Sequence, residues 1–316
     1  MPEVGTRRIW RRAGLGLLAM AALVLASEQP SRAGQQLEPS LRPQRIVSIN
    51  LCTDQLLVGL VERSRIAAVS RLAADPALSA VADRIEGLKR VSGSGEEVLA
   101  LAPDLVVTNE FSTPHVVALL RRVGVPVVVV PIADTFDGIR NAIRVLATSV
   151  GEAARGEAMI ADFDRRLATA SPLSPFRPTA LAYQVNSLTS ESGGLIDAAM
   201  SAAGFVNAAA LRTLGPGGRL PLETFLAHPP DLVVLANDPE AFRTVTADNL
   251  RHRAFRDLLA RRRHVHIPMP LWLCGTPAIA TAVEELGRER ARLIEARAGA
   301  ESVTPAGVAA DIGIAR

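Results

Sequence analysis

The sequence predicts an α/β protein of two similar lobes, each with a central parallel sheet, joined by one long helix. Three observations support this fold. Short β-branched apolar runs alternate with amphipathic stretches, a string of twelve residues occurs twice, and the region between the two copies has helical but no strand periodicity. With 316 residues, 48% of them hydrophobic, the chain can bury a core in each lobe.

The first 33 residues predict a secretory signal peptide. Four arginines within residues 7–12 precede a 14-residue apolar stretch, which is shorter than the roughly 20 residues of a membrane-spanning helix. Small residues allow cleavage after Ala26 or Ala33. Without residues 1–33 the chain has 30 basic and 30 acidic side chains, so the pI near 9.4 indicates export rather than nucleic-acid binding.

The same segment predicts where the protein works. Arg7 and Arg8 resemble a loose twin-arginine signal, but arginine clusters are ordinary in signal peptides, so the general secretory (Sec) route is favoured. No cysteine ends the apolar stretch, and we therefore expect no lipid anchor. The expectation is a soluble protein of the periplasm.

Residues 44–135 are expected to form the first lobe. Continuous apolar strands separated by helices are typical of a parallel sheet that is covered on both faces. The expected strands lie at residues 45–49, 65–70, 104–108 and 125–130, and the expected helices at residues 53–62, 96–102 and 114–123.

Residues 136–172 are expected to form the connecting helix, because apolar side chains recur at helical spacing from Ile139 to Leu167. A continuous helix here would be about 50 Å long, with Gly151 and Gly156 as points where it could kink. The second lobe, residues 178–297, repeats the alternation. Its expected strands lie at residues 179–183, 231–236 and 264–267, its helices at 194–203 and 277–296, with further segments at 224–227 and 250–262, and residues 298–316 are expected to be loose.

The repeated string supports two related lobes. Residues 96–107, EEVLALAPDLVV, recur as residues 223–234, ETFLAHPPDLVV, with eight of twelve positions identical. A Pro-Asp pair before an apolar strand is ordinary turn chemistry and explains that part of the match. It does not explain a glutamate placed seven residues before the proline in both copies.

These two glutamates, Glu96 and Glu223, have two interpretations. Each is expected at the start of a helix, where a carboxylate complements the helix dipole by about 0.3–1 kcal/mol. If a pseudo-two-fold axis relates the lobes, the glutamates instead form a symmetric pair of exposed charges. Such a pair suits docking onto a two-fold symmetric partner that carries arginines.

The strand ends supply the candidate ligand-binding residues. Ligands of parallel α/β sheets bind beyond the carboxyl ends of the strands, so two joined lobes are expected to face each other across a cleft. Tyr183 and Trp272 stand out because the expected mature chain has no other Tyr or Trp, although Trp272 could instead pack under the last helix. The candidates are Asn50, Cys52, Thr53, Arg71, Phe111, Tyr183, Asn186, Trp272 and Cys274.

Cys52 and Cys274 are the only cysteines and lie in strand-end loops of opposite lobes. They could form a disulfide, although such a bond would hold closed a cleft that ought to open. They could also remain two half-buried thiols near the ligand, or supply one soft metal contact. The separation of their Cα atoms would decide between these alternatives.

The sequence offers no catalytic, cofactor or metal site. His264 and His266 point to one face of an expected strand, but no third ligand is evident nearby. The glycines of residues 92–95 lack the lysine and the spacing of a phosphate-binding loop, and no Gly-x-Ser-x-Gly motif is present. We therefore expect a binding protein rather than an enzyme.

Several segments resemble the periplasmic substrate-binding proteins of iron-siderophore, haem and vitamin B12 importers, the two-lobed class with a rigid connecting helix. The resemblance implies two Rossmann-like lobes with the ligand cleft between them. It covers about residues 45–296 and lies in residues 45–56, 96–107, 124–127, 194–197 and 223–234 and in the long helix.

The resemblance also implies a function. A monomer would capture a metal chelate (a ferric siderophore, a corrinoid or haem) and deliver it to the permease dimer and ATPase subunits of an ABC importer, without catalysis or a cofactor of its own. In that family the glutamates matching Glu96 and Glu223 dock into arginine pockets of the permease, and the loop matching residues 271–274 contacts the ligand. Residues 50–52, Asn-Leu-Cys, depart from the family pattern, in which many members have a proline there. An exported chelatase-like metal enzyme and a sensor module without a ligand are the alternatives.

Overall fold

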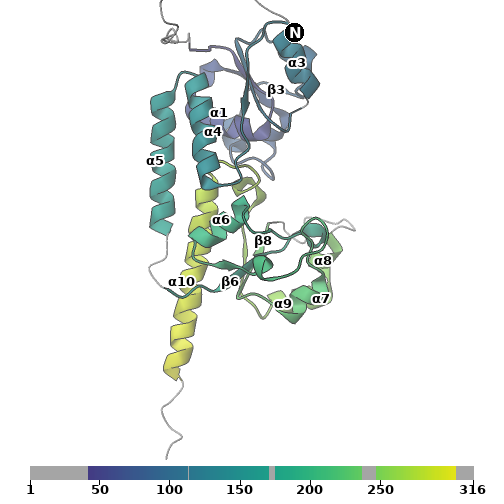
Figure 1. Cartoon of the computed structure of the whole chain (residues 1–316), viewed down its shortest axis with the longest axis vertical. Helices are drawn as coiled ribbons and strands as arrows, with labels where there is room; N and C mark the ends of the chain where they lie inside the picture. The colour runs from purple at the N-terminus through teal and green to yellow at the C-terminus, as the bar shows by residue number, and fades with distance from the viewer. Residues whose placement is uncertain (1–41, 113, 171–174, 237–246, 304–316) are drawn as a thin grey trace, which may run out of the picture. The chain divides into compact units, whose positions relative to one another are not determined.

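The structure, a computed structural model, describes residues 42–112, 114–170, 175–236 and 247–303 (Figure 1). The described residues form one compact unit. The predicted signal peptide, the proline-rich residues 171–174 and residues 304–316 of the predicted tail lie outside the described residues. Within the described ranges, no helix is both long enough and apolar enough to cross a bilayer.

The first lobe is built on a parallel sheet of five strands in the order β3-β2-β1-β4-β5. The longer strands match the predicted apolar runs, whereas β3 has two residues and is too short to produce a pattern. The strands are β1 (Ile46–Ser48), β2 (Ile66–Ser70), β3 (Arg90–Val91), β4 (Leu105–Asn109) and β5 (Val127–Val130), and the α-helices are α1 (Leu51–Leu60), α2 (Gly95–Leu99) and α3 (Pro114–Arg122).

The second lobe has a parallel sheet of four strands in the order β7-β6-β8-β9. Its order matches the run β2-β1-β4-β5 of the first sheet, so that β1 corresponds to β6 and β4 to β8. Its elements are β6 (Thr179–Ala182), α6 (Leu195–Ala202), β7 (Val206–Asn207), α7 (Leu222–Ala227), β8 (Leu232–Leu235), α8 (Asp248–Arg251), α9 (Arg253–Leu259), β9 (His264–His266) and α10 (Ile279–Val303). The predicted fold class is confirmed, with one correction to the connecting helix.

The single connecting helix of the prediction is wrong: the region forms two antiparallel helices, α4 (Phe136–Ser149) and α5 (Ala153–Ala170), which lie side by side (Figure 1). The chain reverses at Gly151, whose φ of +71° is accessible to glycine at little cost. Ion pairs of 2.7 Å join Arg140 to Asp164 and Arg144 to Glu157 across the hairpin. Gly156 is the point of close contact, since a Cβ there would lie 2.5 Å from the Cβ of Ala147.

Helix α5 therefore carries the chain from the first lobe to the second. It packs on α4 and also on α10, where the Arg166 guanidinium donates to both carboxylate oxygens of Glu284 at 2.7 and 3.0 Å and to the Thr281 hydroxyl. Hydrogen bonds from Arg166 lower the pKa of the Glu284 carboxyl. Helix α10 continues to Val303, so residues 298–303, predicted to be loose, are helical: no proline interrupts them.

Three apolar clusters form the core, and their membership follows the alternation of side chains along each strand. The inner cluster runs through both lobes and combines one face of each sheet with α1, α4, α5, α6 and α10. An outer cluster on the first sheet contains Val106 and is covered by α2 and α3. The outer cluster of the second sheet contains Val233, with Phe225 of α7 and Phe255 of α9. Val106 and Val233 occupy the same position of the repeated string.

The repeated string therefore has the same structure in both lobes: a short helix on the outer face, a turn, and a central strand. The aspartate of its Pro-Asp pair also accepts equivalent hydrogen bonds in the two lobes. The Asp104 carboxylate accepts hydrogen bonds from the backbone N–H groups of Gln44 and Arg45, just before β1. The Asp231 carboxylate accepts from the N–H and hydroxyl of Thr179, at the start of β6. Each aspartate thus ties the neighbouring strand in register.

Replacing glycine by alanine is expected to change stability in opposite directions at two positions. Gly151→Ala places a side chain at φ +71° and 2.8 Å from the Arg42 side chain, and should lower the free energy of unfolding by about 1–2 kcal/mol. Gly287→Ala lies within α10 with ordinary contacts and should raise it by up to about 1 kcal/mol. Urea denaturation followed by circular dichroism measures both; equal effects would contradict the hairpin turn.

Candidate ligand-binding site

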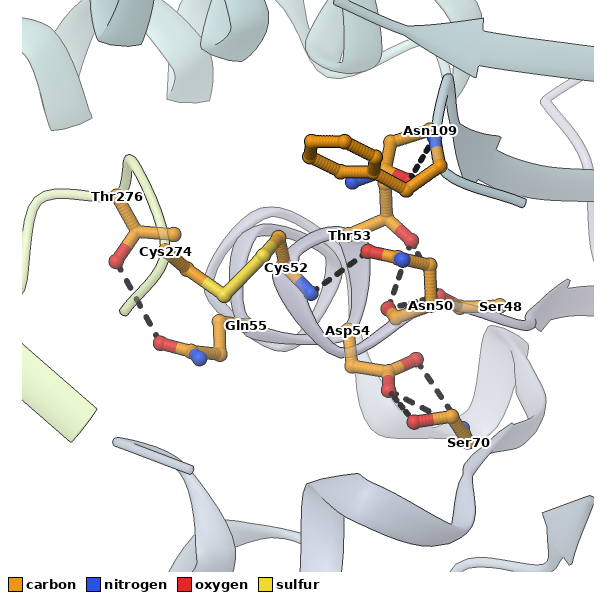
Figure 2. The surroundings of a disulfide bond; sticks show 11 residues. Ser48, Asn50, Cys52, Thr53, Asp54, Gln55, Ser70, Asn109, Cys274 and Thr276 are labelled. Carbon is orange, nitrogen blue, oxygen red and sulfur yellow. Dashed lines mark hydrogen bonds between the residues drawn. A yellow bond between two sulfur atoms is a disulfide. The ribbon is translucent and has the colours of Figure 1, made fainter. Parts of the chain in front are cut away.

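The two cysteines form a disulfide that joins the lobes. Cys52 lies in the first turn of α1, and Cys274 lies in the segment between β9 and α10, with their Cα atoms 5.2 Å apart (Figure 2). This separation settles the alternatives left open by the sequence. We call residues 272–276 the strap, because this segment of the second lobe lies against the first lobe.

Two further contacts hold the strap in place. A Cβ on Gly275 would lie 2.1 Å from the carbonyl oxygen of Ala133, so only glycine allows the two backbones to approach this closely. The Thr276 hydroxyl donates to Oε1 of Gln55 in α1 at 3.5 Å (Figure 2). The strap therefore brings second-lobe side chains to the carboxyl-terminal edge of the first sheet.

A cavity of about 180 Å³ lies between the strap and the first lobe. Its mouth is apolar and exposed: Phe111 is 79% accessible, and Ile132 on the first lobe and Leu273 on the strap are also exposed. The first lobe contributes Cys52, Thr53, Leu56, Asn109, Phe111, residues 130–134 and Ala142, and the second lobe contributes Leu195 and residues 272–275.

A second, more open hollow of about 470 Å³ shares Leu195 and Trp272 with this cavity. Residues 190–194, which precede α6, and Ile196 form the rest of its lining. Trp272 is 4% exposed and belongs to the inner cluster, so it packs in the core, as the alternative interpretation held, and also lines both hollows. Its indole Nε1 has no hydrogen-bond partner in the described part of the chain.

Five of the predicted residues line the cavity: Cys52, Thr53, Phe111, Trp272 and Cys274. The Thr53 hydroxyl is already engaged, because it donates to the carbonyl of Asn50 at 2.9 Å and lies 2.8 Å from the Ser48 hydroxyl. These five residues, which come from the first lobe and the strap, therefore lie around one cavity.

Tyr183 does not line the cavity, and its prediction as a ligand contact is wrong. Its side chain is fully buried in the outer cluster of the second lobe, stacked on Phe225 with ring centroids 4.6 Å apart. The phenol donates to the Ser187 hydroxyl at 3.1 Å. Tyr183 directly follows β6 and points to the same face as Leu181, two residues earlier, which is the face turned away from the strap.

Three other predicted residues are also absent from the cavity lining. Arg71 is exposed and forms an ion pair of 3.0 Å with Glu97, whose pKa is lowered by hydrogen bonds from Ser92 and by the Arg71 charge. Asn50 caps α1, its Oδ1 accepting from the N–H of Cys52 at 2.9 Å. Asn186 is exposed in a turn with φ +59°. Pairing, capping and turn geometry account for these side chains.

The cavity also contains residues that the prediction missed. Residues 131–134 follow β5, so the same strand-end rule would have found them had it been applied to that strand. Leu195 opens α6 and carries no chemical signal of its own. His264 and His266 are exposed on β9, and the described residues contain no cluster of three or more His, Cys, Asp or Glu side chains able to hold a metal.

A buried carboxyl group lies beside the cavity wall. Asp54 is fully buried next to Thr53, and its carboxyl accepts hydrogen bonds from the N–H and the hydroxyl of Ser70 at the end of β2 (Figure 2). Burial raises its pKa to about 7, although hydrogen bonds from Ser48 and Ser70 oppose the shift. The first turn of α1 therefore carries both Cys52 and a buried carboxyl group that titrates near neutral pH.

The two repeated glutamates lie apart from the cavity. Glu96 and Glu223 are both exposed, each in the first turn of its helix, on α2 and α7. Neither carboxylate forms a hydrogen bond or an ion pair with another described residue. The outer faces of the two lobes thus present one equivalent carboxylate each.

The sequence of residues 46–261 matches the periplasmic binding protein family. This chain belongs to that family. The match confirms the resemblance drawn from the sequence, and it does not favour the chelatase-like alternative. None of the curated proteins searched matches this periplasmic binding protein.

Three solved structures are similar to this binding protein. The heme-binding protein RhuT of Roseiflexus sp. RS-1, in its apo form, is 24% identical with a TM-score of 0.64, and the match covers 77% of this chain and 96% of RhuT. The vitamin B12 binding protein BtuF of Vibrio cholerae is 19% identical with a TM-score of 0.59, covering 81% and 98%. The siderophore-binding protein BauB, bound to two acinetobactin molecules and ferric iron, is 12% identical with a TM-score of 0.58, covering 78% and 93%. At these identities the likeness establishes the fold.

The Asp54 carboxyl makes stability depend on pH. Its pKa is raised on folding, so it contributes stability below about pH 4 that is lost as the pH rises toward 7. Asp54→Asn mimics the protonated group, and should gain on the order of 3 kcal/mol of unfolding free energy relative to wild type between pH 5 and pH 8. Urea denaturation at both pH values measures this difference. Glu62→Gln, at an exposed carboxylate, should show no such gain; a constant difference for Asp54→Asn would contradict the shifted pKa.

Proposed function

We propose that this periplasmic binding protein is the solute-binding component of an ABC importer, and that it captures a metal chelate between its lobes without catalysing a reaction. The observation that carries the proposal is the cavity whose walls come from both lobes and whose mouth is apolar. A cavity of about 180 Å³ is smaller than the roughly 300–1,000 Å³ of enclosed ligand sites. A chelate would therefore sit partly in the cavity and partly on Phe111, Ile132 and the open hollow beside Trp272.

The chemistry of the lining favours a chelate without net negative charge. Asp134 is the one charged side chain among the described residues that line the cavity, and Arg71, which would have suited an acidic siderophore, is paired with Glu97. The two sulfurs are bonded to each other, and no His, Met or Tyr lies in the described lining, so the chelator itself would complete the metal's coordination. The Trp272 N–H, buried without a partner, would donate to an acceptor on the ligand.

The equivalent glutamates supply the second half of the proposal. Glu96 and Glu223 are exposed at the same position of two related lobes, so they present matched charges to a permease dimer with two-fold symmetry. The protein would act as a monomer, delivered to the periplasm through the general secretory route by the signal peptide of residues 1–33. ATP hydrolysis would belong to the ATPase subunits of the importer.

A panel of chelates is expected to identify the ligand class. Cyanocobalamin, haemin, a cationic ferric hydroxamate and an anionic ferric catecholate are added to the mature protein, and its melting temperature and Trp272 fluorescence are recorded. A true ligand at one hundred times its Kd should add about 2.7 kcal/mol of stability. The neutral or cationic chelates should stabilise more than the anionic one. A melting temperature unchanged by every chelate would reject the proposed function.

Removing the two glutamates is expected to separate transport from binding. Glu96→Ala with Glu223→Ala should reduce chelate uptake through the cognate importer by about tenfold or more, because two charged contacts with the permease are lost. The affinity for the chelate, measured by Trp272 fluorescence, should stay within about twofold, since neither side chain lines the cavity. Glu62→Ala, also at an exposed carboxylate, is the matched control and should transport normally. A parallel loss of affinity and uptake would argue against docking.

A further inference from the structure

We propose that the Cys52–Cys274 disulfide sets the width of the ligand cleft, and that its reduction by a dithiol releases the strap and widens the cavity. Both cysteines belong to the cavity wall and come from opposite lobes. The prediction for ligand exchange rests on the proposed function, whereas the prediction for the strap itself does not.

The disulfide is the strongest of the contacts that hold the strap to the first lobe. The Thr276–Gln55 hydrogen bond, at 3.5 Å, is at the limit of a hydrogen bond, and the Gln55 Nε2 has no partner among the described residues. The Gly275 backbone packs against Ala133 without a side chain of its own. Once the covalent bond is broken, Trp272 still anchors one end of the strap in the inner cluster, and only the weak polar contact and the packing of Gly275 oppose movement of the rest.

The position of the bond determines which dimension of the cavity it controls. Leu273, beside Cys274 on the strap, and Phe111 and Ile132, on the first lobe, all line the cavity and are exposed, so both lobes contribute to its mouth. The cysteines lie 222 positions apart in the sequence, and the chain between them runs through both lobes, so the bond is a direct link between walls that are otherwise connected only through the core. A fixed link there keeps the cavity narrow. A ligand therefore contacts the side chains of the mouth and is not fully enclosed.

The reduction is an ordinary thiol–disulfide exchange. Cys52 is half-buried and Cys274 is 1% exposed, so the thiolate of a dithiol attacks the Cys52 sulfur and displaces Cys274. The second thiol of the reagent then attacks its own mixed disulfide and releases Cys52. The reagent leaves as a cyclic disulfide, having supplied two electrons, and its two protons pass to the cysteine sulfurs.

The test compares the mature protein, oxidised and after reduction with dithiothreitol, with the Cys52→Ser, Cys274→Ser double variant. Hydrogen exchange of the backbone amides in residues 272–276, without ligand, should become about tenfold or more faster in the reduced and variant proteins, because the strap opens locally. Exchange in β4 and β8 reports that the fold is intact. Dithiothreitol should leave the double variant unchanged, which excludes effects of the reagent elsewhere.

Ligand exchange gives the second readout, with cyanocobalamin as the probe and Trp272 fluorescence as the signal. Dissociation should be about tenfold or more faster from the reduced protein and from the double variant than from the oxidised protein. Strap exchange and dissociation that both stay within about twofold of the oxidised protein would overturn the inference. If cyanocobalamin does not bind, or if the variant fails to fold, hydrogen exchange of the wild-type protein before and after reduction decides the question. Absence of binding by every chelate counts only against the proposed function.

Discussion

The apolar cluster that runs through both lobes is the constraint on which the rest of the structure depends. It joins the inner face of the first sheet, with Leu105 and Val107, to that of the second, with Leu232 and Val234, through α4, α5 and α10. Pulling the lobes apart would expose this surface at roughly 25 cal/mol per Å², whereas a flexible linker would impose no such penalty. The spacing of the lobes is therefore set by packing, and the cavity exists because both of its walls are fixed to the same core.

The duplicated string separates what folding requires from what function uses. Its apolar residues supply the central strand of each sheet, and its aspartates, Asp104 and Asp231, hold the neighbouring strands through hydrogen bonds. The glutamates at its start are different, because the carboxylates of Glu96 and Glu223 are exposed and make no hydrogen bond or ion pair with the residues described. Helix dipole compensation gives each of them at most a small stabilising role. The two glutamates occupy equivalent positions in the repeat but make no contact that the fold requires. For this reason we propose that they bind a partner protein.

The sequence specified the elements well but not the directions of turns or the faces of side chains. The apolar runs located the longer strands because burial on both faces leaves a continuous signal. Helices α4 and α5 looked like one helix because both direct an apolar stripe to the same cluster, and only the backbone conformation of Gly151 reveals the reversal. Tyr183 was chosen for its rarity, yet its alternation with Leu181 already placed it on the outer face. Contacts such as Cys52 with Cys274, which lie 222 residues apart, depend on how the two lobes pack and have no local signal.

A covalent bond across a binding cleft conflicts with ligand entry only if the lobes must swing apart to admit the ligand. Here the inner cluster already opposes such a movement of the lobes, so the bond fixes the position of the strap rather than the spacing of the lobes. Entry requires an opening on another side, and the exposed side chains of Phe111, Ile132 and Leu273 mark one. The strap then acts as a fixed wall against which a chelate is pressed from outside. In this geometry the disulfide keeps the cavity narrow, and ligands are selected by the shape of the part they insert.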